Sequence, residues 1–230
     1  MRIQKFLAKA EIASLRKSEI YIKQGLVKIN DEIAAIGQKI NPNDKVYFKN
    51  RLVIFKNTKE YYILNKPKKY VTTTSDNFNR PIVVDLINTK SRIYPVGRLD
   101  YDTTGLLILT NDGDLTYKLT HPKFEIERVY IATLDTNLNE QEMELINSNH
   151  FKINQKISKQ KVEKISDRKY KVIISQGWYH HVKRMFAEFN KKVIELERVK
   201  YSFLEIGSLK IGEYKKLTPD EVSRLKKLFD

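Results

Sequence analysis

The run from Gly97 to Gly113 constrains the fold of this 230-residue chain more than any other segment. Its second half contains Gly105-Leu106-Leu107-Ile108-Leu109-Thr110, an apolar stretch of strand length between turn-rich segments, which predicts a buried strand. Its first half is a turn that carries Arg98 and Asp100 directly before that strand. A loop held by a buried strand is a rigid mount for functional side chains. We therefore expect Arg98 and Asp100 to take part in chemistry.

The carboxylate of Asp100 has three possible roles, as a metal ligand, a general base or a covalent nucleophile. The aspartates at positions 100, 102, 112 and 114 do not reproduce the spacing of a calcium-binding loop, and a strand separates the two pairs. The segment 111–114 is more simply a turn in which Gly113 takes a positive φ. The chain has no cysteine and four histidines, so we expect no metal site. A paired-carboxylate glycosidase is chemically possible, but the charge of the chain favours a polyanionic substrate.

The chain is strongly basic, with 43 Lys and Arg against 28 Asp and Glu, a net charge of +15. Residues 1–58 hold 12 of the basic side chains and only 5 of the acidic ones. Binding of basic side chains to nucleic acid releases counterions from the phosphates, and this stabilises the complex. A nucleic acid is therefore favoured over a membrane surface as the partner. No apolar run approaches the roughly 20 residues that span a bilayer, and the start lacks a secretory signal. We expect a cytoplasmic protein that has no membrane partner.

The first quarter of the chain predicts a small module of two helices and a short sheet. Helical spacing begins at residue 2 and again at Ser14, a plausible N-cap, and strand patterns follow at 27–31 and 45–48. The stretch resembles the S4 RNA-binding domain in the order of its basic, apolar and glycine positions. That resemblance implies that Arg16 and Lys17, which follow the first helix, meet RNA phosphates. We place this domain at residues 1–58.

The remaining residues, 59–230, predict an α+β domain with a largely antiparallel sheet. Strand patterns outnumber helices and do not alternate regularly with them. The expected strands lie at 61–64, 105–110, 129–134 and 170–174, and the expected helices at 139–146 and 182–189. A last helix is expected from Thr218, because Thr, Pro and Glu follow the pattern of a capping box.

Several motifs in a fixed order, spread over nearly the whole chain, resemble those of pseudouridine synthases of the RsuA/RluB type. The family's Gly-Arg-Leu-Asp, followed by x-x-Thr-Ser/Thr-Gly-Leu-Leu, matches residues 97–107. Further matches are Leu64-Asn65-Lys66-Pro67, Arg80-Pro81, Asp85-Leu86, Arg128-Val129-Tyr130, residues 177–186 and Gly212-Glu213-Tyr214. An N-terminal S4 domain is also that family's arrangement. The resemblance implies a pseudouridine synthase fold and isomerisation of uridine to pseudouridine in RNA.

The resemblance also implies a role for each matching residue. Asp100 matches the catalytic aspartate, and Arg98 the arginine that fills the space left when the target base leaves its stack. Tyr130 matches the tyrosine that packs on uracil and is implicated in moving a proton, and Lys183 the basic residue that pairs with the aspartate. Arg184, beside it, is a further RNA-binding candidate. The isomerisation includes no redox step or hydrolysis, so we expect no cofactor.

Departures from the family pattern are confined to a few positions. Trp178 replaces a basic residue and His181 a glutamine, while Lys69 replaces the glycine usual after Lys-Pro-x. Residues 177–185 are closer to the small-subunit type, so we expect the substrate to be a uridine of 16S rRNA, with the rRNA as part of a small-subunit assembly particle. We expect the protein to be a monomer. The alternatives are a uridine of large-subunit (23S) rRNA and a non-catalytic rRNA-binding assembly factor.

Overall fold

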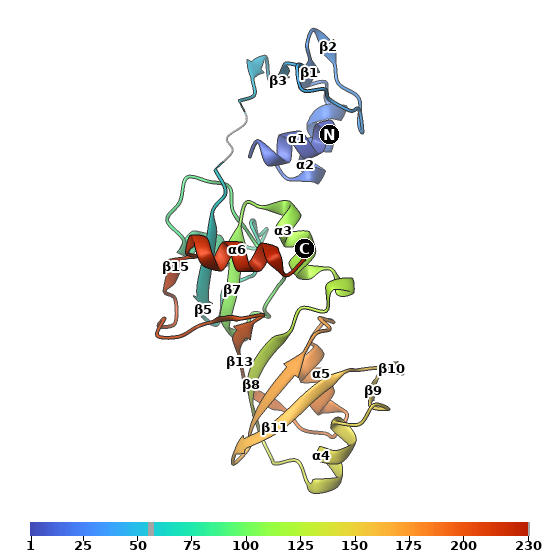
Figure 1. Ribbon diagram of the computed structural model, residues 1–230, viewed down its shortest axis with the longest axis vertical. Coiled ribbons are helices and arrows are strands. Elements are labelled where there is room, and N and C mark those ends of the chain that lie inside the picture. Colours follow the sequence, from blue (N-terminus) through green and yellow to red (C-terminus); the bar gives the residue numbers. More distant parts are fainter. Residues whose placement is uncertain (55–57, 230) are drawn as a thin grey trace. The chain divides into compact units, whose positions relative to one another are not determined.

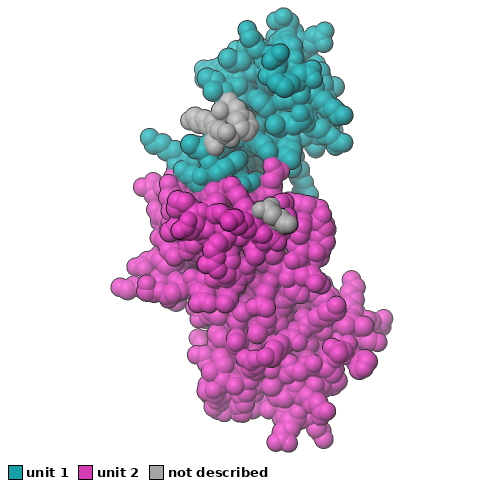
Figure 2. Space-filling view, viewed as in Figure 1, with its two compact units in different colours: residues 1–60, 90–92, 111–113 teal, residues 61–89, 93–110, 114–230 magenta. Residues whose placement is uncertain are grey.

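The computed structural model describes residues 1–54 and 58–229, which form two compact units (Figures 1 and 2). One unit comprises residues 1–60 with the segments 90–92 and 111–113, and the other comprises 61–89, 93–110 and 114–230. The domain boundary expected at residue 58 follows directly on residues 55–57, which lie outside the described part of the chain. No described helix is long and apolar enough to cross a membrane.

The first unit has the two helices and the small sheet that the sequence predicts. Ser14 caps the second helix, because its hydroxyl accepts a hydrogen bond from the backbone N–H of Lys17. The sheet has the order β2-β1-β3-β4. The elements are α1 Ile3–Lys9, α2 Leu15–Lys23, β1 Val27–Ile29, β2 Glu32–Ile33, β3 Val46–Phe48 and β4 Arg51–Leu52. Their core contains Ile3, Leu7, Ile22, Val27, Ile29, Ala34 and Val46.

The second unit is built on one large sheet whose path runs β11-β12-β8-β13-β7-β5-β15, with β14 beside β13 and β6 beside β7. All of its strand pairs are antiparallel except β13 with β7, which confirms the expected α+β fold with a largely antiparallel mixed sheet. The strands are β5 Tyr61–Lys66, β6 Tyr94–Pro95, β7 Thr104–Thr110, β8 Arg128–Leu134, β11 Gln160–Ser166, β12 Lys169–Ile174, β13 Val193–Tyr201, β14 Leu204–Glu205 and β15 Tyr214–Lys216.

The remaining elements of this unit are short helices and one small hairpin. The α-helices are α3 Gly113–Thr120, α4 Glu140–Ile146, α5 His181–Ala187 and α6 Pro219–Lys227. The two 3-10 helices are Val83–Leu86 and Pro122–Phe124, and the hairpin pairs β9 Lys152–Ile153 with β10 Lys156–Ile157. Thr218 caps α6 with the expected capping box.

Strand β7 is buried on both faces, which explains its continuous apolar sequence. Leu106 and Ile108 belong to a core cluster that also contains Leu119 of α3 and Leu225 of α6. Leu107, one residue along, belongs to a second cluster that includes side chains of α5. In Figure 1, α6 crosses the strands β5 and β7, while α5 and α4 lie at the other end of the sheet. The strand is thus fixed from both sides, and so is the loop that enters it.

Gly105 allows β7 to pair in parallel with β13. A Cβ at this position would lie 2.3 Å from the carbonyl oxygen of Arg198, and its φ of +107° excludes most side chains. We expect Gly105→Ala to lower the free energy of unfolding by about 3 kcal/mol. Urea denaturation should show it. Gly207→Ala is the control, because Gly207 also has a positive φ but open space around it; an equal loss there would contradict the steric explanation.

The prediction of a turn at 111–114, with a positive φ at Gly113, is wrong. Gly113 starts helix α3 and is absent from the described glycines with positive φ. Leu115 and Leu119, spaced at i and i+4, are buried in the core, and this burial outweighs the local preference of Asn-Asp-Gly for a turn.

Candidate active site

The loop between β6 and β7 borders a cavity of about 390 Å³ in the second unit. This volume lies within the range of small-molecule sites. The cavity is lined from distant parts of the chain by side chains that include Arg98, Asp100, Tyr130, Trp178, His180 and Arg198. Of the residues singled out from the sequence, Arg98, Asp100 and Tyr130 therefore share one site.

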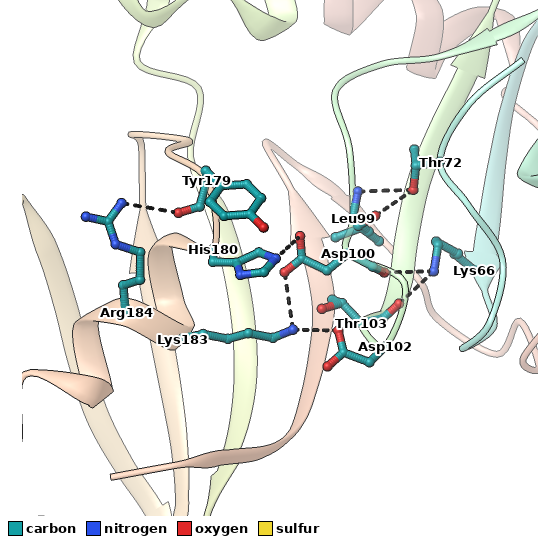
Figure 3. Close-up of polar contacts among 10 residues, drawn as sticks. All are labelled: Lys66, Thr72, Leu99, Asp100, Asp102, Thr103, Tyr179, His180, Lys183 and Arg184. Carbon is teal, nitrogen blue, oxygen red and sulfur yellow. Dashed lines mark hydrogen bonds and ion pairs between the residues drawn. The ribbon is translucent and has the colours of Figure 1, made fainter. Parts of the chain in front are cut away.

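Two basic side chains from the segment 180–183 face the Asp100 carboxylate (Figure 3). Lys183 Nζ lies 3.3 Å from Asp100 Oδ2, and His180 Nε2 lies 3.6 Å from Asp100 Oδ1. Lys183 also binds Asp102, at 2.5 Å. Burial acts to raise the pKa of Asp102, but the hydrogen bond and charge of Lys183 outweigh it and hold that pKa below its ordinary value. The structure thus brings together Asp100 and Lys183, which are 83 positions apart in the sequence.

Lys66, at the end of β5, holds the Asp100 loop from behind. Its side chain is fully buried, and its Nζ donates hydrogen bonds to the carbonyl oxygens of Pro67, Asp100 and Thr103, each at 3.0 Å. Burial lowers the pKa of Lys66 to about 8, against the opposing charges of Asp100 and Asp102. In the sequence Lys66 belongs to the Leu64-Asn65-Lys66-Pro67 motif, from which no role was predicted for it.

Further contacts fix the same loop. The Thr72 hydroxyl donates to the carbonyl oxygen of Leu99 at 2.6 Å and accepts from the Leu99 N–H at 3.3 Å. The N–H of Lys69 donates to the carbonyl oxygen of Tyr101 at 2.7 Å. Lys69 has a φ of +66°, which explains why glycine suits this position in relatives. The backbone around Asp100 is therefore held on several sides.

Tyr130 of β8 is buried in the cavity wall together with Arg198 of β13, a residue that was not predicted from the sequence. Arg198 Nε donates to the carbonyl oxygen of Leu106 at 2.7 Å, and Nη1 lies 3.5 Å from the Tyr130 hydroxyl, to which it donates. The guanidinium also lies 5.1 Å from the centre of the Tyr201 ring. This cation ties the cavity wall to β7, the strand that carries the Asp100 loop.

Residues 178–181 contribute two stacked aromatic pairs. Trp178 and His181 have ring centroids 4.5 Å apart, and Tyr179 and His180 have theirs 3.9 Å apart. His181 bonds to the Ser158 hydroxyl at 2.7 Å, and burial lowers its pKa to about 4, so it is neutral at pH 7. The replacement of glutamine by His181 thus keeps an uncharged hydrogen-bonding group.

The other candidates for RNA contact have no described ion pair with the Asp100 carboxylate. Arg98 is exposed where it lines the cavity. Arg184 lies on α5 with its Nη1 3.5 Å from the carbonyl oxygen of Tyr179, so it supports the loop rather than the carboxylate (Figure 3). Arg16 and Lys17 are exposed at the start of α2 in the first unit.

A carboxylate that faces Lys183 and His180, beside a buried tyrosine and in a cavity of this size, suits nucleophilic or general-base chemistry on a planar ring. A sequence model of the family described as RNA pseudouridylate synthase matches residues 60–188, and that of the S4 domain matches residues 1–46.

Named relatives agree with these two matches. The chain is 37% identical to ribosomal large subunit pseudouridine synthase B of Bacillus subtilis, covering 100% of this chain and 97% of that protein. It is 32% identical to the dual-specificity RNA pseudouridine synthase RluF of Escherichia coli, covering 100% of this chain and 80% of the relative. A crystal structure of a pseudouridylate synthase superposes with a TM-score of 0.70 at 32% identity and covers 99% of both chains.

Proposed function

Because the chain belongs to the RNA pseudouridylate synthase family, as a member of the RsuA/RluB/RluF type with an S4 domain, we propose that it isomerises a uridine of ribosomal RNA with Asp100 as nucleophile. One observation carries the assignment of the nucleophile. The Asp100 carboxylate lies in the cavity with Tyr130, and Lys183 is 3.3 Å from it. The positive charge of Lys183 and the negative charge of the carboxylate attract each other across this distance, which holds the carboxylate in place as a nucleophile.

The reaction breaks the N1–C1′ bond of uridine and forms a C5–C1′ bond. The Asp100 carboxylate attaches to the sugar or the base while the two are separated, and it leaves unchanged when the new bond forms. The proton lost from C5 passes to solvent, and N1 gains one, so atoms and charge balance with no cofactor. Tyr130 packs on the flipped uracil, and Arg98 fills the space that the base leaves in the RNA.

The first unit supplies sequence-independent contact with the phosphate backbone in this proposal. Arg16 and Lys17 are exposed at the start of α2, in the part of the chain that holds almost half of the excess positive charge. Each such contact releases counterions and makes affinity fall with salt. We propose that the S4 domain ends near residue 58 and that the protein acts as a cytoplasmic monomer.

Two candidates stand for the ribosomal subunit whose rRNA contains the target uridine. The Bacillus relative is named a large-subunit enzyme, and its match covers this whole chain, which favours a 23S uridine. The small-subunit target expected from the segment 177–185, and an assembly particle as its setting, stay a prediction supported by Tyr179 and His180 in that segment. Mapping of pseudouridine in both rRNAs, from cells with and without the gene, separates the two by the position that is lost.

The activity itself is tested by tritium release. Purified protein is mixed with protein-free rRNA, and separately with ribosomal particles, whose uridines carry tritium at C5. We expect tritium in the solvent in amounts that match one uridine per rRNA. Tight RNA binding with no release from either substrate would contradict the enzymatic proposal and favour a non-catalytic assembly factor.

A further inference from the structure

The ring of Tyr179 is offered to solvent beside the active site. Its centroid lies 3.9 Å from that of His180, with the planes 16° apart, so one face of the tyrosine is covered. The residue is nevertheless 68% exposed, which leaves its other face open. Figure 3 shows the two rings lying side by side near the Asp100 carboxylate. An exposed aromatic ring held flat in this way is preorganised for stacking.

The neighbouring pair, Trp178 and His181, connects the loop to the rest of the unit. Trp178 packs against the main core, and its partner His181 is buried and bonded to Ser158. This inner pair anchors the loop. Tyr179 is not among the side chains of the three core clusters. Core packing therefore gives no reason for a large aromatic side chain at this position.

The position and charge of the outer pair indicate what it binds. His180 contacts both the Tyr179 ring and the active centre: its ring stacks on that of Tyr179, and its Nε2 lies 3.6 Å from Asp100 Oδ1. The following helix α5 adds the positive charges of Lys183 and Arg184. An open π-face beside basic side chains is the arrangement that binds single-stranded nucleic acid, with bases on the rings and phosphates on the cations.

We propose that Tyr179 is a stacking platform for an unpaired nucleobase that neighbours the target uridine in the RNA. The inference rests on the proposed function and adds a binding site for a second nucleotide. When the uridine leaves its stack, the adjacent base loses a stacking partner. Tyr179 replaces that partner and recovers part of the cost of flipping. Stacking uses the π-face that every base has, so the platform tolerates any base.

The test is a double-mutant cycle on binding. The probe is an RNA hairpin whose loop holds one uridine, with the nucleotides on both sides of it either intact or abasic. Affinities are measured in an Asp100→Asn background, so that the uridine is not converted. Tyr179→Ala should weaken binding of the intact hairpin about 5- to 150-fold. It should change binding of the abasic hairpin less than about twofold. Tyr179→Phe, which keeps the ring, should bind like the parent protein.

Tyr117→Ala is the matched control, because Tyr117 is also exposed and also lies beside a histidine ring, but that histidine, His121, has no described contact with Asp100. Thermal melting should be unchanged in both alanine variants. Equal losses of affinity on the intact and abasic hairpins would overturn the proposal that Tyr179 stacks on a base. No loss on either hairpin would overturn it too, and is the result expected if this ring binds a protein partner instead. The proposed function fails separately, if the wild-type protein releases no tritium, because the binding cycle involves no turnover.

Discussion

Asp100→Asn is expected to lower tritium release on the order of 10⁴-fold or more, because the amide cannot serve as a nucleophile. The side chain keeps its size, and the loop is held through backbone contacts from Lys66 and Thr72, so the fold should not change. Affinity for RNA should stay within about threefold of wild type, since phosphate contacts elsewhere supply most of it. The measurement is single-turnover tritium release at saturating enzyme, with binding measured on the same RNA.

Asp102→Asn is the matched control for this prediction. Asp102 lies in the same loop, binds the same Lys183 and loses the same charge in the variant, but its side chain is 66% exposed. We expect its effect on the rate to stay below about tenfold, through a small change in how Lys183 is held. The reverse ranking, with Asp102 essential and Asp100 dispensable, would remove Asp100 from the role of nucleophile.

The sequence predicted those parts of the fold that rest on local signals. Ser14 and Thr218 start their helices because capping is encoded within three residues. The run 105–110 forms a buried strand because a short, continuous apolar stretch between turn residues is typical of a strand that is covered on both faces. Helix α3 escaped prediction because Asn-Asp-Gly signals a turn locally, and only the core contacts of Leu115 and Leu119 override it.

The sequence predicted the active-site residues that belong to a local motif. It did not predict those that reach the site only because distant strands pair. Asp100 lies in a turn that the sequence marks, whereas Lys66 reaches the loop only because β5 pairs with β7, which sets Lys66 opposite Gly105. Arg198 meets Leu106 across a parallel pair of strands 92 residues apart. The one signal available for Arg198 was its place in the alternation of β13. Leu196, two residues before it, is buried, and a charged side chain at the next buried position of a strand indicates a functional residue.

Lys66 predicts an alkaline limit to activity. Its protonated amine donates to three carbonyl oxygens, including that of Asp100, and places a positive charge behind the carboxylate. A neutral amine has two protons and no charge, so one carbonyl loses its donor as pH rises through the pKa of about 8. We therefore expect the turnover rate of the wild-type enzyme to fall above about pH 8.

Stability should change in the opposite direction over this range. Folding lowers the pKa of Lys66 from 10.5 to about 8, so between these values the unfolded chain binds more protons than the folded one. The contribution of this residue to the free energy of unfolding therefore rises from about pH 8 to 10.5. A rate that falls while this contribution rises separates loss of loop geometry from loss of fold.

Lys66→Met tests both consequences. Removal of the three donors lets the loop move, and a misplacement of about 1 Å costs on the order of 10²-fold in rate. The remaining activity should lack the decline near pH 8. Lys68→Met, two residues along, removes an exposed lysine whose only described ion pair is a 3.9 Å contact with Glu195, and it should keep both the rate and the decline. Single-turnover rates from pH 6 to 10 give the answer; persistence of the decline in Lys66→Met would assign it to another group and leave Lys66 as a structural tie alone.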